Sequence, residues 1–221
     1  MNRILAVASG LAAVVLSGSA AAQTPTARSG MSTADTVGNM NAYRELRDFG
    51  ICFARTQRSA AIAIIAAPQN SPEERRAMQG TVFGDDLITN CMGGGDRTSM
   101  STIFARGTVA EGLLLSGGVP PQLLRPAPSP EQVTDLAGAG RCYAAGHQGE
   151  IRALLATRIS SPEERAAAAA LWTEFRPCLA RYNIRLNAVW IRYILAEGLL
   201  TLAPTEPAPA SPAPASPAPG N

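Results

Sequence analysis

The sequence Ser-Pro-Glu-Glu-Arg occurs twice in this chain of 221 residues, at positions 71–75 and 161–165. Both copies predict the start of an α-helix: the serine is the N-cap, the proline takes the first helical position, and the second glutamate lies three residues after the cap. Acidic side chains in a first turn also complement the helix dipole. We interpret both Glu-Glu pairs as helix caps and give them no acid/base role.

These copies belong to a longer internal repeat. From residue 50 to 77, a shift of 90 positions gives 11 identities in 28 positions, and it aligns Cys52 with Cys142. A second block matches at a shift of 86, where Arg-x-x-x-Ala-Glu-Gly-Leu-Leu occurs at 106–114 and again at 192–200. The second cysteines, Cys91 and Cys178, lie between these blocks. Such a repeat predicts one structural unit made twice.

The predicted fold class is all-α, a tandem duplication of a small unit of three to four helices. Alanine and leucine richness without strict alternation argues against strands. We expect the two units to form one domain, because units of this size seldom stabilise alone. The predicted segments are a signal peptide at 1–22, a flexible leader at 23–38, unit one at 39–116, a Pro/Gly linker at 117–129, unit two at 130–203 and a disordered Pro/Ala-rich tail at 204–221.

Each unit is predicted to follow the same order of helices. The first helix carries the first cysteine, with Tyr43, Leu46, Phe49 and Phe53 at helical spacing in unit one. A short apolar helix follows, at 60–67 and at 151–157. The Ser-Pro-Glu-Glu-Arg helix then reaches the second cysteine. A final helix runs from residue 98 or 99 to 115, and from about 187 to 202.

The four cysteines are expected to form one disulfide in each unit. A duplicated unit should carry its own bridge, so we predict Cys52 with Cys91 and Cys142 with Cys178. Each bridge closes a loop of about 40 residues and is worth roughly 3 to 4 kcal/mol by the chain-entropy estimate.

The N-terminus predicts export to the periplasm or the medium. Arg3, an apolar run over residues 4–16 and the small residues at 20–22 form a secretory signal, with cleavage near Ala22. That run is shorter than the roughly 20 residues needed to span a bilayer, and no later segment competes, so we expect no transmembrane segment. The formal net charge of +2 is too small to imply a nucleic-acid partner.

Two Arg/Glu sets are the candidate site residues: Arg106 with Glu111, and Arg192 with Glu197. A separation of five residues places their side chains about 140° apart on a helix, so they do not form the usual i,i+4 pair. We interpret them as ion pairs that tie the last helix of a unit to a neighbour, and a ligand-binding arginine is the alternative. His147 is the only histidine, and no Cys-x-x-Cys, phosphate loop or metal-ligand set occurs. No catalytic residue, metal or cofactor is therefore predicted.

The following motifs occur in order: Phe49-Gly50-x-Cys52-Phe53-Ala54, Ser-Pro-Glu-Glu-Arg, a second cysteine and Arg-x-x-x-Ala-Glu-Gly-Leu-Leu. In this order of motifs the chain resembles uncharacterised exported helical proteins of Gram-negative bacteria that carry this two-cysteine unit in tandem. The resemblance covers residues 45–116 and 132–202 and implies no activity, so it supplies no functional residues.

Three functions are carried forward as hypotheses. The leading one is a non-catalytic binding or scaffolding protein of the cell envelope, whose partner is an unknown envelope protein or polymer and whose tail is a spacer of about 50 Å. The second is a periplasmic stress chaperone of the holdase type. The third is an enzyme with a cleft between the units, around Arg106 and Arg192.

Overall fold

The computed structural model describes residues 36–79, 91, 102–184 and 186–204. The predicted signal peptide, most of the predicted leader and the tail from residue 205 lie outside these ranges. Within them the chain is all-helical, with seven α-helices and no strand. One isolated bridge pairs Arg125 with Leu202 and ties the linker to the end of the last helix.

The helices follow the predicted order in both halves of the chain. The first half contains α1 (Thr36–Thr56), α2 (Arg58–Ala66), α3 (Pro72–Gln79) and α5 (Thr102–Leu115); the second contains α6 (Leu136–Ala156), α7 (Pro162–Phe175), η4 (Arg176–Leu179) and α8 (Ala188–Thr201). Two further 3-10 turns, η2 (Pro121–Leu123) and η3 (Pro130–Gln132), lie in and after the linker. The predicted boundary of the leader was wrong at its end, because α1 begins at Thr36 and residues 36–38 are helical.

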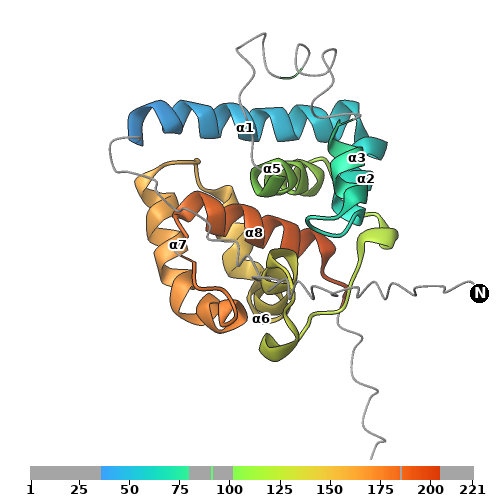
Figure 1. Cartoon of the computed structure of the whole chain (residues 1–221). Coiled ribbons are helices and arrows are strands. Elements are labelled where there is room, and N and C mark those ends of the chain that lie inside the picture. The colour runs from blue at the N-terminus through green and yellow to red at the C-terminus, as the bar shows by residue number, and fades with distance from the viewer. Residues whose placement is uncertain (1–35, 80–90, 92–101, 185, 205–221) are drawn as a thin grey trace, which may run out of the picture.

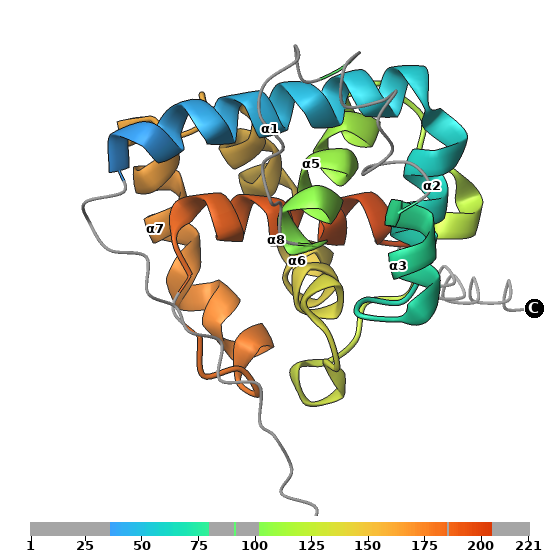
Figure 2. The same cartoon turned by 45° about the horizontal axis from the view of Figure 1, so that its top comes forward.

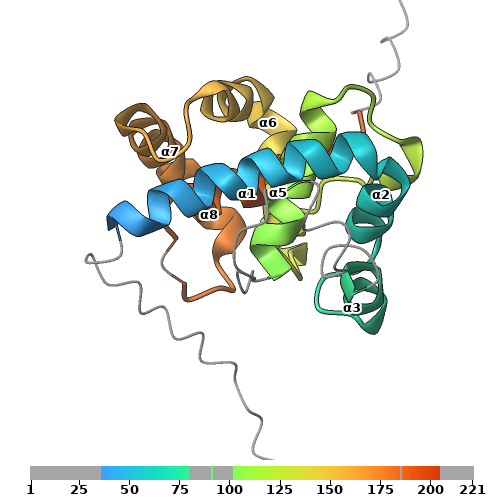
Figure 3. The same cartoon turned by 90° about the horizontal axis from the view of Figure 1, so that it is seen from above.

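The two last helices, α5 and α8, cross at the centre of the molecule. They lie between α1 on one side and α6 on the other, while α7 and the α2–α3 pair flank opposite ends of this stack (Figures 1, 2 and 3). Each half thus packs its cysteine-bearing helix on its own last helix, and the two last helices join the halves. One hydrophobic cluster contains side chains from both halves, among them Phe49, Leu113, Phe175 and Leu199.

Glycines allow the helices of each half to approach closely. A Cβ atom on Gly50 of α1 would lie 2.2 Å from the Thr108 carbonyl oxygen of α5, and one on Gly112 would lie 2.2 Å from the Gly50 oxygen. In the second half, a Cβ atom on Gly198 of α8 would lie 2.1 Å from the carbonyl carbon of Gly140 on α6. No side chain larger than hydrogen fits these crossings.

The short apolar helices differ in how they join the first helices. In the first half, α1 ends at Thr56 and α2 starts at Arg58, with Gln57 between them at φ −128° and ψ 46°. In the second half α6 spans both predicted helices, and a non-helical kink at His147, where φ is −129° and ψ is 31°, divides them. His147 aligns with Gln57 at the shift of 90, so the chain bends at matching positions in both halves.

The Ser-Pro-Glu-Glu-Arg helices start as predicted. The Ser71 Oγ accepts a hydrogen bond from the Glu74 N–H at 3.0 Å, and the Ser161 Oγ accepts one from the Glu164 N–H at 3.1 Å. The glutamates reach back one residue further than in an ordinary capping box. Their Oε2 atoms accept from the backbone N–H of Asn70 and of Ser160, both at 2.6 Å. Asn70 and Ser160 both have positive φ, 62° and 61°.

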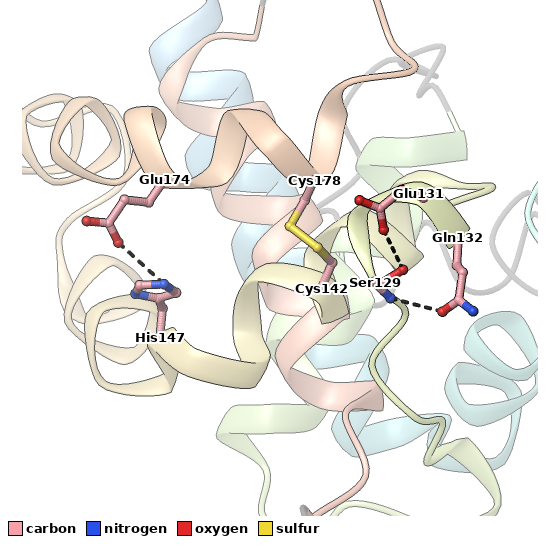
Figure 4. The surroundings of a disulfide bond; sticks show 7 residues. All are labelled: Ser129, Glu131, Gln132, Cys142, His147, Glu174 and Cys178. Atoms are coloured by element: carbon pink, nitrogen blue, oxygen red, sulfur yellow. Dashed lines mark hydrogen bonds and ion pairs between the residues drawn. A yellow bond between two sulfur atoms is a disulfide. The ribbon is translucent and has the colours of Figure 1, made fainter.

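Two disulfides link the pairs expected from the repeat: Cys52 with Cys91, and Cys142 with Cys178. In the second half the bridge joins α6 to η4, the short turn that follows α7 (Figure 4). The α-helix therefore ends at Phe175, before the second cysteine that it was predicted to reach. No helix of the described residues has the length and apolar character needed to cross a membrane.

Candidate functional site

Arg192 of α8 is fully buried and bridges three segments of the chain. Its Nε donates to Glu111 Oε2 at 3.0 Å and its Nη2 to Glu111 Oε1 at 2.7 Å, a bidentate pair with a carboxylate of the other half. Its Nη1 donates to Glu164 Oε1 at 3.1 Å. The remaining N–H groups reach the carbonyl oxygens of Leu154, Leu155 and Thr157 at the end of α6, at 3.2, 2.7 and 3.2 Å.

Arg106 of α5 makes the matching set of contacts in the opposite direction. Its Nε donates to Glu197 Oε1 at 3.0 Å, and its Nη2 donates to the same oxygen. Its Nη1 donates to Glu74 Oε1 at 3.1 Å. The other acceptors are the last carbonyls of α2 and its C-cap, those of Ile64, Ile65 and Ala67, at 2.8, 3.1 and 2.9 Å.

Each arginine therefore caps a helix C-terminus, where the last carbonyl groups have no partner within the helix and the helix dipole is negative. The same guanidinium binds the first-turn glutamate of the next helix in its own half, so it fixes the turn between α2 and α3 or between α6 and α7. Its third contact, with a glutamate of the other half, joins the two halves. We call this set of six side chains the buried network: Glu74, Arg106, Glu111, Glu164, Arg192 and Glu197.

The electrostatics of the network favour charged arginines. Burial lowers the pKa of Arg192. The hydrogen bonds and charge of Glu111, and then those of Glu164, raise this pKa by more than burial lowers it, so the net shift is upward. Arg106 follows the same balance, with burial opposed by Glu197 and then by Glu74. All six residues are at most 3% exposed, and buried ions of this kind are tolerated only when they are paired and hydrogen-bonded.

The candidate residues of the sequence are all in this network, but they pair between the last helices. Arg106 binds Glu197 rather than Glu111, and Arg192 binds Glu111 rather than Glu197. Glu74 and Glu164 were missed as members. The interpretation that capping accounts for them fully was wrong, because one carboxylate oxygen of each caps a turn and the other binds an arginine. Their presence in both copies of the repeat was the available signal.

The edges of the network differ between the halves. Glu111 receives an additional hydrogen bond from Arg47 Nε at 2.8 Å, and Arg47 is partly exposed. Glu197 instead receives one from Gln69 Nε2 at 3.3 Å. The corresponding positions at the shift of 90 are Ala137 and Ile159, so both of these polar side chains come from the first half and have apolar equivalents in the second.

Two cavities adjoin the network at Arg106. One of about 210 Å³ is lined by residues that include Gln69, Arg106, Arg125 and Arg141. Another of about 240 Å³ is lined by residues that include Glu74, Arg106, Asp135 and Tyr182. Arg106 borders both cavities, but its N–H groups point to the carboxylates and carbonyls described above.

His147 lies away from the network, at the kink of α6. Its ring stacks on Tyr143, with ring centroids 4.2 Å apart and planes 6° from parallel. Its Nε2 lies 3.3 Å from Glu174 Oε2 of α7 (Figure 4). The histidine thus links the kink to the neighbouring helix, on the side of α6 where the disulfide also joins α6 to the segment after α7.

No protein-family model, curated protein or solved structure matches this chain. Its described part is an all-helical protein with two disulfides, in which a buried Arg–Glu network joins the first half to the second.

Proposed function

We propose that this protein is an exported, non-catalytic binding or scaffolding protein of the cell envelope, built by tandem duplication of a helical unit. The observation that supports it most strongly is the use of Arg106 and Arg192. An enzyme with a cleft between the units would need these guanidinium groups to present N–H donors to a substrate. Each nitrogen of both groups is instead hydrogen-bonded to a glutamate or to a helix-terminal carbonyl.

The duplication is supported by contacts that recur at matching positions. Arg106 and Arg192 cap equivalent turns, Glu74 and Glu164 play equivalent double roles, and each half has its own disulfide. Arg106 and Arg192 each bind a glutamate of the other half. Such reciprocal contacts are what a two-fold arrangement of like units would give. We infer that the ancestral unit associated as a pair and that fusion made the pairing permanent.

Export is supported by the predicted signal peptide and by the disulfides. Structural disulfides persist mainly in oxidising compartments such as the periplasm. The resemblance to exported Gram-negative helical proteins with a tandem two-cysteine unit belongs to the same proposal. Expression of the full chain with a C-terminal tag, followed by fractionation and N-terminal sequencing, tests it. A periplasmic product that begins at Gln23 is expected, and a cytoplasmic product that retains Met1 would contradict export.

The binding function is tested by capture from an envelope extract. The baits are the mature chain from Gln23, the same chain ended after Pro204, and the mature chain after reduction and alkylation. We expect one envelope component to bind the oxidised chain, to be lost from the reduced chain, and to bind again when both components are purified. Loss on removal of residues 205–221 would assign the contact to the tail, and retention would assign it to the helical body. Absence of any such component with both oxidised baits would contradict the proposal.

The holdase hypothesis remains a separate prediction. It requires apolar surface that is exposed under stress, and in the described residues the exposed large apolar side chains are Leu115 and Val119. Light scattering of an aggregating client at falling pH tests it, because a holdase would suppress aggregation at equimolar amounts. This hypothesis is set aside if scattering is unchanged.

A further inference from the structure

Arg141 of α6 borders the cavity of about 210 Å³ that lies beside Glu197. The cavity is bordered by the end of α8, the segment after α2 and the linker, and its lining includes Thr201, Arg125 and the acidic residues Asp135 and Glu197. Arg125 is held there by the backbone, since its N–H donates to the Thr201 carbonyl at 2.7 Å and its carbonyl accepts from Ala203 at 2.8 Å. This volume is below the usual range for drug-sized ligands and fits a compact one.

The guanidinium of Arg141 is incompletely paired. Its Nε is buried and has no hydrogen-bond partner. Its Nη1 makes one long contact, to Thr201 Oγ1 at 3.4 Å. The N–H groups of a partly buried guanidinium are ordinarily satisfied, and a carboxylate that accepts from two of them is their best partner.

The nearby carboxylates are engaged elsewhere. Glu197 is held by Arg106 and Gln69, and Asp135 Oδ1 caps α6 by accepting from the Gly138 N–H at 2.5 Å. The electrostatics agree: burial lowers the pKa of Arg141, and the charges of Asp135 and Glu197 do not restore it. Arg106, which is more deeply buried, has its pKa raised by its own glutamates.

Three polar residues of this cavity have no polar equivalent in the other half of the chain. At the shifts of the repeat, Arg141 corresponds to Ile51, Gln69 to Ile159 and Thr201 to Leu115. The first half thus has apolar residues at the positions equivalent to Arg141 and Thr201, and one of them, Leu115, is exposed. A partly buried charge costs stability, and the apolar residue at the equivalent position shows that the helix does not need it.

We propose that this cavity binds a compact carboxylate, held by the Nη donors of Arg141. The inference deepens the proposed binding function by naming a ligand class. It rests on the proposed function only in assuming that the protein binds a ligand. The test below uses the purified protein and small compounds, so its result does not depend on an envelope component. Such a carboxylate could belong to a small organic acid or to the C-terminus of a peptide, and the experiment separates the two.

The test uses the ¹⁵N-labelled mature protein, in which each arginine Nε–H gives an NMR signal. The protein is titrated at constant ionic strength with sodium acetate, sodium succinate, N-acetyl-Gly-Ala with a free carboxylate, the C-terminal amide of that dipeptide and sodium phosphate. The Arg141 signal is identified by its absence in the Arg141→Gln variant. We expect it to shift saturably with a carboxylate and not with the amide. A stronger response to the dipeptide indicates a chain terminus, and a stronger response to acetate or succinate indicates a free acid.

Thermal unfolding with and without the best carboxylate gives a second measurement. Arg141→Gln should weaken binding at least about tenfold, the effect of losing charge-assisted hydrogen bonds. Arg152→Gln, on the exposed side of the same helix, removes the same charge and should leave binding unchanged. If Arg141→Gln does not fold, Arg141→Lys retains the charge, loses the forked donors and should weaken binding likewise.

The proposal is overturned by an unshifted Arg141 signal, by an equal response to amide or phosphate, or by equal weakening in Arg152→Gln. None of these outcomes bears on capture of an envelope component.

Discussion

Arg192 on α8 donates two hydrogen bonds to Glu111 on α5, at 3.0 and 2.7 Å, and so joins the last helix of the second half to the last helix of the first. Arg106 on α5 makes the reciprocal pair with Glu197 on α8. The same two arginines also cap the ends of α2 and α6. The turns within each half and the junction between the halves are therefore held by the same side chains, and they should be lost together when the protein unfolds.

Glu111→Gln should strongly destabilise the protein. The substitution removes the negative charge that Arg192 binds through two hydrogen bonds, and it leaves a buried cation short of a partner. Breaking a buried pair in this way costs about 3 to 5 kcal/mol. Urea unfolding followed by circular dichroism measures the loss. Glu45→Gln, on the exposed side of α1, removes the same charge and should change the free energy of unfolding by less than about 0.5 kcal/mol. Equal effects in the two variants would show that Glu111 has no special role.

Two glycines of one helix should respond in opposite directions to the same substitution. Gly140→Ala places a Cβ atom 2.3 Å from the Ile194 carbonyl oxygen, so α6 and α8 must separate, at a cost of about 3 kcal/mol or more. Gly149→Ala meets no atom within 4 Å. Because alanine has the higher helix propensity, it should stabilise the protein by about 0.5 to 1 kcal/mol. Thermal unfolding of both variants measures the difference, and a change of the same sign in both would refute the close crossing.

Each disulfide should contribute a similar amount to stability. The bridges close loops with sequence separations of 39 and 36 residues, and the chain-entropy model gives about 4 kcal/mol for either. We expect comparable decreases in the free energy of unfolding in two double variants: Cys52→Ala with Cys91→Ala, and Cys142→Ala with Cys178→Ala. Denaturation without reductant compares the two variants with the parent. A loss below about 1 kcal/mol in either variant would contradict the prediction.

Stability should fall in alkaline solution partly through Tyr143. Burial, and then the charges of Glu174 and Glu150, raise its pKa from 10.0 to about 12. The unfolded chain therefore releases this proton at a lower pH than the folded protein does. Stability from this group is complete below pH 10 and is lost as pH rises towards 12. Phenolate absorbance follows the titration, and unfolding curves across this range give the slope. Tyr143→Phe should make the decline shallower, and an unchanged decline would exclude Tyr143 as a cause.

The local architecture could be predicted from particular residues. Ser71 and Ser161 mark helix starts because capping depends on a few neighbouring residues, and both caps are present. The cysteine pairs followed from the repeat without any knowledge of packing. The break between the first helix and the short apolar helix lies at matching positions, at Gln57 in the first half and at the kink of His147 in the second.

The partners in the buried network could not be predicted in the same way. The spacing of Arg106 and Glu111 indicated only that the two side chains diverge around one helix. Glu74 looked fully explained as a cap, although one of its oxygens was left for Arg106. Nothing in the order of residues marked Arg141 as incompletely paired, because that depends on the positions of Asp135, Glu197 and Thr201 around it.

The order of residues is enough to predict the helix starts, the repeated plan and the choice of cysteine partners, since these depend on neighbouring residues and on the comparison of one copy with the other. The pairing of Arg106 with Glu197 and of Arg192 with Glu111 follows from the folded arrangement of the helices. The physical reason is that a buried charge takes the partner that the crossing of α5 and α8 places within hydrogen-bonding distance. That crossing in turn depends on how α1 and α6 close against the two helices through their glycines.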